Sequence, residues 1–488
     1  MSYNSMLYAV LLVPLVAAIA VSIVPPKKLK FLITNLAYLL LYMLFIALLI
    51  TNSSFPIVGN LLGIKNAFLL NSTSLTLIII LTFISHMLTL GFILNRPAMA
   101  EKLDLILLML FATYGIITSN NLIVLLLFME IALAATTFIL LGKRRESLEA
   151  TIKMVIMLIL GSIFMIIGLG GLYTVLRGQN IDIDGLSISY LSSTNLVKHN
   201  IKVSNIVLFS YLMVLLGIGI ETGIVPFYMW LPDVYSGPDA FSSALFILLV
   251  DTADLYALLR ISSLYGFIFG NLADVIELVT NVIIAFSMAS FILGELSALT
   301  QTNLRRIFGY SGVADAGYTL LLSSCLALSK APPQYPSALL AITTFFIMFS
   351  NIALSNIISL IGIIEEKGIS KIDEVRGLPW RLPILSINLL IPLFSLAGVP
   401  PLVGFIAKFF VISAITKSLN KVVAVIVIVF FAVCAAYVLR IITNLCYRPS
   451  RFAREREFII RILPFSIINL VLLICGILPN IILKFMIG

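Results

Sequence analysis

The sequence predicts an all-α polytopic membrane protein, and three observations support that fold class. Hydrophobic residues make up 61% of the 488-residue chain and charged residues only 11%, whereas about a quarter of the residues of a soluble domain are charged. Apolar runs of about 20 residues, the length that crosses a bilayer as a helix, recur along the whole chain. No segment between these runs is long enough to form a soluble domain.

The apolar runs predict about fourteen transmembrane helices. They cover residues 5–24, 30–51, 72–95, 103–119, 121–142, 151–176, 203–230, 240–266, 272–298, 306–328, 336–364, 383–414, 421–446 and 458–486. The first run lacks a basic leader and a small-residue cleavage site, so we expect a membrane helix there and not a removable signal.

Two of these helices contain residues that interrupt helical hydrogen bonding. The seventh is interrupted between Gly223 and Pro226, and the twelfth contains the run SLAGVPPLVGFIAKFF. Proline has no backbone N–H, and broken helices at corresponding places in two halves are typical of inverted-repeat transporters. The five-helix spacing predicts two inverted five-helix repeats; two unrelated proline kinks are the alternative.

This repeat pattern gives the expected organisation of the chain. We expect N-terminal transmembrane helices over residues 1–119 and a first repeat region over 120–266. A second repeat region follows over 272–446, and a C-terminal helix over 447–488.

Basic residues are concentrated in alternate loops. The loops after odd-numbered helices hold about 18 lysines and arginines, and the opposite loops hold about 7. Cytoplasmic loops are the basic ones, so both termini are predicted to lie outside the cytoplasm. The net charge of +9 then follows from loop topology, and we expect no nucleic-acid partner.

Charged residues also occur inside the apolar runs, where an unpaired ion is costly. The candidates for ion translocation are Glu130, Lys153, Glu221, Asp251, Asp254, Asp315 and Lys408. Such a polar line suits a proton or cation relay, because each ion that binds shifts the pKa of the neighbouring groups. Simpler interpretations remain open for Lys153 and Arg260 as snorkelling cations, and for Asp254 and Glu295 as acids near helix ends.

No motif for catalysis or cofactor binding competes with this interpretation. The chain has no nucleotide-binding glycine loop, no Ser/His/Asp arrangement and no CxxC pair, and its four cysteines are scattered. His86 and His199 are too few for a haem or metal site, and His86 is interpreted as a helix-packing residue. We expect no cofactor and no catalytic site.

Four stretches are similar to a known family: LLLFMEIALAATTFILL, PFYMWLPDVYSGPDAFSSALF, LTQTNLRRIFGYSGVADAGY and LAGVPPLVGFIAKFF. The chain resembles the antiporter-like membrane subunits of respiratory complex I, membrane-bound hydrogenases and related ferredoxin-linked complexes, and the Mrp cation/proton antiporters. The length of 488 residues fits the shorter members, which lack a lateral helix.

The resemblance implies a subunit of a redox-driven complex in a prokaryotic plasma membrane that translocates H⁺, Na⁺ or both. Its expected partners are other membrane subunits and, through them, a peripheral redox module.

The resemblance also assigns roles to individual residues. Glu130 matches the family's helix-five glutamate and Lys408 its helix-twelve lysine, and Lys153 falls where some members have a lysine early in helix six. Glu221 stands where the family usually has the helix-seven lysine, and Asp315 where glutamine is commoner.

Two more basic positions of the family are missing. Thr252 falls at the helix-eight lysine or histidine, and Ser350 or Asn351 at the helix-eleven lysine. One interpretation is an acid-rich ion path, with Na⁺ held near Glu130 and Glu221. The alternatives are a non-pumping structural subunit of the same kind of complex and, less in keeping with the sequence, a stand-alone secondary transporter.

Overall fold

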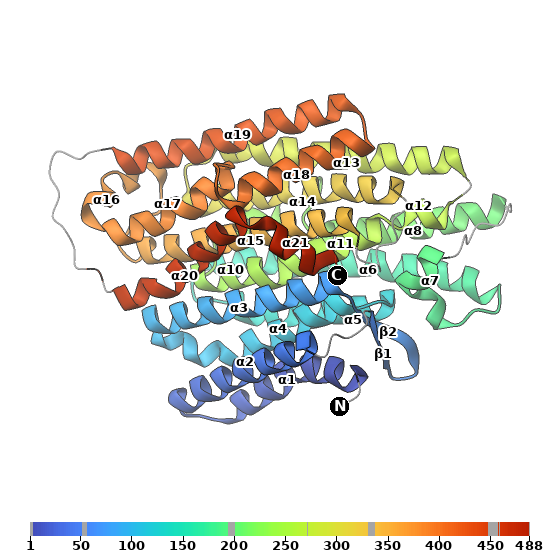
Figure 1. The fold of residues 1–488 in the computed structure, drawn as a ribbon, viewed down its shortest axis with the longest axis horizontal. Coiled ribbons are helices and arrows are strands. Elements are labelled where there is room, and N and C mark those ends of the chain that lie inside the picture. The colour runs from blue at the N-terminus through green and yellow to red at the C-terminus, as the bar shows by residue number, and fades with distance from the viewer. Residues whose placement is uncertain are drawn as a thin grey trace.

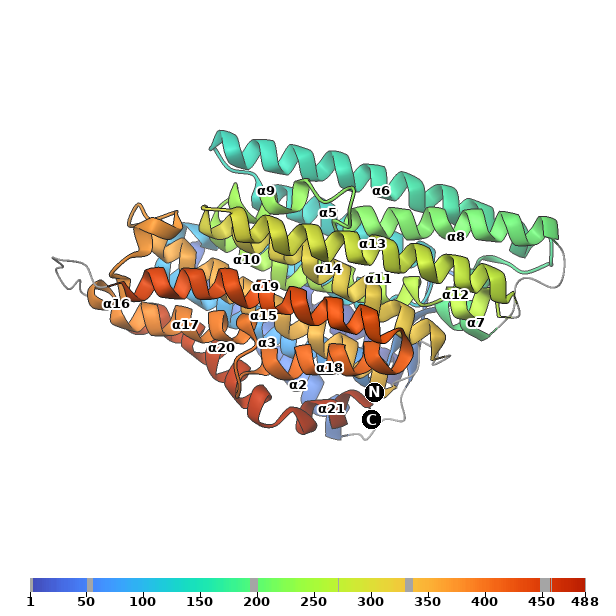
Figure 2. The same cartoon turned by 90° about the horizontal axis from the view of Figure 1, so that it is seen from above.

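The structure is a computed structural model. It describes residues 3–50, 56–193, 201–270, 272–329, 337–447, 457 and 459–487. His199 and the basic residues of 448–456 lie outside the described residues. The long helices run along the longest axis of the molecule in a single bundle (Figure 1). The same arrangement is seen after a quarter turn (Figure 2).

Within the described part of the chain, ten helices are long and apolar enough to cross a membrane. They are α1 (Tyr3–Ile23), α2 (Lys27–Ile50), α3 (Ser72–Asn95), α5 (Leu122–Leu140), α6 (Arg145–Arg177), α13 (Ala273–Thr300), α14 (Leu304–Leu328), α15 (Ala338–Glu365), α19 (Lys421–Cys446) and α20 (Ile459–Ile477).

The other four expected spans are short or interrupted. They correspond to α4 (Leu103–Thr118), to α8 (Ile201–Glu221) with α9 (Trp230–Ser236), to α10 (Ala240–Phe246) through α11 (Thr252–Ser262), and to α17 (Pro383–Ala397) with α18 (Val403–Ser418). The predicted α-helical polytopic fold is therefore confirmed.

Two local features differ from the expectation. An antiparallel hairpin of β1 (Ile57–Leu61) and β2 (Ile64–Leu70) lies between α2 and α3. Leu62 and Gly63, its two loop residues, both have positive φ, as in the two-residue turns that favour hairpins. The last expected span is divided, because α20 ends before Pro479 and α21 (Pro479–Ile487) begins there.

Short helices occupy the connections. They are η1 (Pro97–Lys102), η2 (Ile183–Leu186), α7 (Ile188–Ser193), α12 (Tyr265–Ile268), η4 (Ile372–Val375) and α16 (Leu378–Arg381). The hairpin, α7 and α12 lie at one end of the bundle, and α16 lies at the other (Figure 1). The end that holds α16 also holds the described basic residues Lys27, Arg96 and Arg306 and is called the basic end below.

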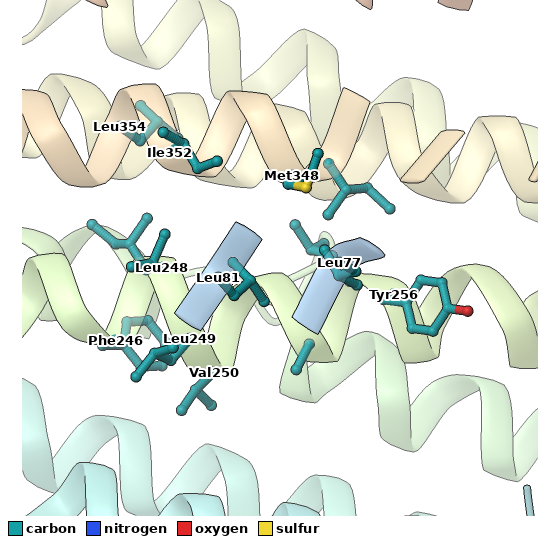
Figure 3. Close-up of a cluster of buried hydrophobic side chains, with 14 of the residues drawn as sticks. Leu77, Leu81, Phe246, Leu248, Leu249, Val250, Tyr256, Met348, Ile352 and Leu354 are labelled. Atoms are coloured by element: carbon teal, nitrogen blue, oxygen red, sulfur yellow. The ribbon is translucent and has the colours of Figure 1, made fainter. Parts of the chain in front are cut away.

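The helix of residues 240–262 lies at the centre of the bundle. All of its residues are buried, and its middle is a π-helical turn, η3 (Ile247–Asp251). It packs against α3, α4, α8, α14 and α15. Leu77 and Leu81 of α3 and Met348 of α15 lie beside it (Figure 3). Because neighbouring helices enclose it on all sides, this helix can carry polar groups without exposing them to lipid.

Both predicted helix breaks are present, and they share a local structure. Gly223 follows α8 with φ +70° and Gly398 follows α17 with φ +79°, a conformation that glycine adopts without steric cost. A proline follows each glycine three residues later, at Pro226 and Pro401, and both prolines are preceded by cis peptide bonds. This recurrence supports a repeat, while the symmetry of two inverted five-helix units stays a prediction.

Arg305, at the start of α14, fixes the turn between α9 and α10. Its buried guanidinium donates to the carbonyl oxygens of Tyr235 (2.9 Å) and Pro238 (2.7 Å) and to the hydroxyl of Ser243 (3.1 Å). It also pairs with Glu365 of α15 at 3.1 Å. A buried cation needs such a complete set of partners, so this residue holds α9, α10, α14 and α15 in register.

We expect Gly404→Ala to destabilise the protein. A Cβ at Gly404, in the first turn of α18, would lie 1.8 Å from the carbonyl oxygen of Ser395 in α17. The two halves of the broken helix would have to separate, and overpacking of this kind costs about 1–3 kcal/mol. Thermal unfolding of the purified protein in detergent would show the loss as a lower Tm.

Gly170→Ala is the matched control for that change. Gly170 is exposed on α6, and a Cβ there would meet nothing within 4 Å. Alanine is the better helix former, so the control should keep or raise the Tm. Equal Tm values for Gly404→Ala and the parent protein would contradict the close contact between α17 and α18.

Candidate functional site

Five carboxylates are buried among the central helices. Their residues are between 2% and 7% exposed, and they are Glu221, Asp251, Asp254, Glu295 and Asp315. An isolated ionised carboxylate is too costly at bilayer depth, so each must be protonated, paired or bound to a cation.

Glu221 is the last residue of α8, directly before the first helix break. Ser162 of α6 donates to its Oε1 over 3.4 Å. The two helices approach closely here, since a Cβ on Gly161 would lie 2.9 Å from the carbonyl oxygen of Gly217. Glu221 also lies within electrostatic range of Asp254 on the central helix. The break therefore presents a carboxylate to the middle of the bundle.

Asp251 and Asp254 lie three residues apart on the central helix, a spacing that places them on one face. Tyr235 donates to Asp251 Oδ2 over 3.0 Å, and Asn351 donates to the same oxygen over 3.4 Å. Asn351 also donates to Thr252 Oγ1 over 3.0 Å. Among the residues that the structure describes, Asp254 Oδ1 is buried and has no hydrogen-bond partner. The structure thus brings the two non-titrating residues, Thr252 and Asn351, into direct contact.

Asp315 connects this group to the second helix break. It accepts a hydrogen bond of 2.5 Å from Ser350 and lies within electrostatic range of both Asp251 and Lys408. The resulting series runs from Glu221 through Asp254 and Asp251 to Asp315, and these four residues are called the buried acid row. Lys408 stands at its end.

Lys408 is held by the broken twelfth helix. Its Nζ donates to the carbonyl oxygen of Leu396 over 2.6 Å and lies 4.9 Å from the centre of the Phe431 ring. Leu396 is in the last turn of α17, where carbonyl oxygens have no intrahelical partner. A cavity of about 20 Å³ adjoins Lys408, Ser350 and Ser395, large enough for one water molecule.

Glu130 is placed differently from the buried row. It is exposed, on a stripe of α5 that also exposes Leu127, Ala134 and Phe138. It remains within electrostatic range of Glu221 but is not enclosed with it. The described residues contain no group of three or more His, Cys, Asp or Glu side chains arranged to hold a metal ion. Na⁺ binding near Glu130 and Glu221 stays a prediction.

Lys153 lies at the basic end, outside the buried row. It is 45% exposed on α6, which forms an outer edge of the bundle (Figure 2), and it pairs with Glu149 at 2.7 Å and Asp233 at 2.8 Å. Asp233 also pairs with Arg306 at 3.2 Å. These residues line an open polar cavity of about 330 Å³. This placement matches the interpretation of Lys153 as a snorkelling interfacial lysine.

The simpler interpretations of Glu295 and Arg260 have different outcomes. Glu295 does lie near a helix end, five residues before Thr300, but it is 2% exposed and accepts a hydrogen bond from Tyr318 over 3.2 Å. Arg260 does not snorkel; it is also 2% exposed and donates to the carbonyl oxygen of Ile117 over 3.1 Å. A sequence signal existed for Glu295, since small residues recur every three or four positions on α13 at Ser287, Ser290, Gly294 and Ala298.

His86 is a packing residue, as expected. Its two ring nitrogens lie 2.9 Å from Tyr42 Oη and 2.9 Å from Asn35 Oδ1, and its ring stacks on Tyr38 with centroids 4.4 Å apart. These contacts join α2 to α3.

Curated relatives match a large part of the sequence. NADH-quinone oxidoreductase subunit N 2 of Acidobacterium capsulatum is 30% identical over 316 residues, which cover 63% of this chain and 60% of that protein. NADH-quinone oxidoreductase subunit N of Nitrosomonas europaea is 26% identical over 392 residues, covering 76% of this chain and 74% of that protein. The chain thus matches less than two thirds of the first relative's length.

Solved structures share the fold over nearly the whole chain. A chain of the membrane-bound sulfane sulfur reductase, an archaeal respiratory membrane complex, has a TM-score of 0.84 at 22% identity and covers 98% of this chain and 96% of its own. A chain of the Mrp complex from Dietzia sp. DQ12-45-1b has a TM-score of 0.83 at 18% identity, with coverages of 100% and 96%. A chain of respiratory complex I from Thermus thermophilus has a TM-score of 0.80 at 19% identity, with coverages of 99% and 98%.

The transmembrane family model described as NADH:quinone oxidoreductase/Mrp antiporter matches residues 119–435. That segment is more than half of the chain and contains both helix breaks, the buried acid row and Lys408. The chain therefore belongs to the NADH:quinone oxidoreductase/Mrp antiporter transmembrane family.

Proposed function

We propose that the chain translocates H⁺ or Na⁺ along the buried acid row, as a membrane subunit of a redox-driven complex. The observation that carries this proposal is the continuous row of buried acids that ends at Lys408 on a broken helix. The names of the relatives and the complexes of the structural neighbours support a multisubunit assembly. We place it in a prokaryotic plasma membrane with both termini outside the cytoplasm.

Charge balance gives the mechanism. Five buried carboxylates with one neighbouring lysine would carry a net charge of −4 if all were ionised (−5 plus +1). Such a charge is too costly at bilayer depth, so most of the acids must hold a proton or share a cation. Each ion that enters or leaves changes the affinity of the neighbouring site. Occupancy therefore passes along the row by electrostatic coupling.

An ion that moves from the first helix break to the second is passed from one acid to another. Thr252 contacts Asn351, and neither changes charge. By the resemblance, a base is expected at Thr252 and another at Ser350 or Asn351. Asp251 and Asp315 lie within electrostatic range of each other across this position. Asp254 Oδ1, which has no partner among the described residues, is an acceptor that a proton or Na⁺ can use. The chain thus replaces a lysine relay by an acid relay.

The missing bases also favour a second candidate, a non-pumping subunit that couples its neighbours structurally. The cavities among the described residues give less support to a stand-alone secondary transporter. Small-molecule sites usually measure about 300–1,000 Å³, whereas the cavity beside Lys408 is about 20 Å³. Two larger cavities are a polar one of about 330 Å³ at the basic end and an apolar one of about 300 Å³ between α8 and α13, which Pro226 of the first helix break helps to line. Neither is lined by an acid of the buried row.

Glu221→Gln separates the two main candidates. Glutamine keeps the size of the side chain but cannot carry a proton or a negative charge, so ion uptake should fall roughly tenfold or more. The measurement is donor-driven H⁺ and ²²Na⁺ uptake into inverted vesicles that contain the native complex. Glu277→Gln, at an exposed position in α13, is the control and should keep full uptake. Unchanged uptake by Glu221→Gln would support the non-pumping subunit.

Lys153→Gln should have little effect. Lys153 is 45% exposed and its ion pairs with Glu149 and Asp233 are screened by water, so the stability loss should be about 1 kcal/mol or less. Ion uptake in the same vesicles should remain close to that of the parent complex. A loss as large as that of Glu221→Gln would show that Lys153 belongs to the path itself.

A further inference from the structure

Glu295 of α13 is the one buried carboxylate of the described chain that the row does not include. Its Oε1 accepts a hydrogen bond from Tyr318 over 3.2 Å, and its Oε2 is buried without a partner. A buried oxygen without a donor is costly, and more so if the group is ionised. A purely structural acceptor would be expected to use both oxygens. The free oxygen points to a group that binds a proton at some stage.

A chain of contacts joins Glu295 to Lys408. Lys408 Nζ and Cys434 Sγ both donate to the carbonyl oxygen of Leu396, over 2.6 and 3.6 Å. Cys434 Sγ lies 3.2 Å from Tyr437 Oη. Tyr437 Oη donates to Ser311 Oγ over 3.0 Å, and its side chain lies close enough to Glu295 to interact with it. The ammonium, thiol, phenol and carboxyl groups of this chain all carry exchangeable protons.

Glu295 also lies on the side of Lys408 that leads to the basic end. It is five residues before Thr300, where α13 ends, which corresponds to about 7.5 Å along the helix. Beyond that end, Arg440 donates to the carbonyl oxygens of Leu299 (2.8 Å) and Gln301 (3.3 Å). Lys408 instead contacts Leu396, which lies 13 residues after the start of α17 at Pro383, beside α16, or about 20 Å along that helix. A proton on Glu295 is therefore closer to the basic end than one on Lys408.

We infer that Glu295 and Lys408 form the acid–base pair of this chain and that Glu295 is a proton-carrying station between Lys408 and the basic end. The inference rests on the proposed function. The two groups lie within electrostatic range of each other, and Asp315 lies within electrostatic range of both. The resemblance implies a glutamate on helix five paired with a lysine on helix seven. At these two positions this chain has two acids, Glu130 and Glu221. The base and its acid thus belong to the second half of the chain.

The proton step balances without any further reactant. The Lys408 ammonium loses one proton and becomes an amine, while the Glu295 carboxylate gains one and becomes a carboxylic acid. Tyr437 and Cys434 each accept one proton and release one, so their own states are restored. Two opposite charges disappear together, and the low polarity of the site favours that neutral state over separated ions.

Glu295→Gln in the native complex tests the inference. We expect donor-driven H⁺ uptake into inverted vesicles to fall roughly tenfold or more, because glutamine cannot carry a proton. Glu295→Asp should restore much of the uptake with a shifted pH profile, which a structural role would not produce. Glu277→Gln, exposed on the same helix, is the matched control and should behave like the parent complex.

Tyr437→Phe is the second variant, in case Glu295→Gln fails to assemble. It removes one hydroxyl of the bridge and keeps both charged ends, so we expect slower H⁺ uptake and a changed pH profile. Parent-like uptake with an unchanged profile in both Glu295→Gln and Tyr437→Phe would overturn the inference. If Glu221→Gln still loses uptake in that case, the proposed function stands. If Glu221→Gln also keeps uptake, both fail.

Discussion

The cost of a charge in hydrocarbon organises this protein. Three of the four acids in the buried row, Asp251, Asp254 and Asp315, occupy helices that other helices surround, and the helix of residues 240–262 is buried throughout. Of the ten long apolar helices described, α14 is the least hydrophobic and the most buried. A helix that never meets lipid needs no apolar outer face, so its composition is free to include Asp315. Enclosure thus comes first, and the ion chemistry depends on it.

Close helix contacts make that enclosure possible. Gly294 of α13 and Gly317 of α14 each face backbone atoms of the other helix, at less than 3 Å from where a Cβ would be. Small residues allow such approaches and strengthen helix association in lipid, where the hydrophobic effect gives no preference for one helix face. The space left beside Lys408 therefore holds about one water molecule, and it is not a wide channel.

Much of the fold follows from the sequence, because span length and backbone-breaking residues are local signals. The apolar runs predicted the spans, and Gly223 and Gly398 with their following prolines predicted both helix breaks. The orientation of side chains around each helix was not predictable in the same way. Soluble helices show their inner face by amphipathicity, but a membrane helix is apolar on both faces. The burial of Glu295, the contact between Thr252 and Asn351, and the outward position of Glu130 depend on such orientations.

The outward position of Glu130 has a consequence for the membrane around the protein. Its stripe on α5 also exposes Leu127 and Phe138, so lipid tails would otherwise cover this side of the helix. A carboxyl group in contact with lipid tails is unfavourable, and water and headgroups move inward to solvate it. The bilayer becomes thinner at that place. A neighbouring protein surface with a hydrogen-bonding or basic group removes that deformation. The elastic energy of the bilayer would therefore be lower when a protein surface covers Glu130 than when lipid does.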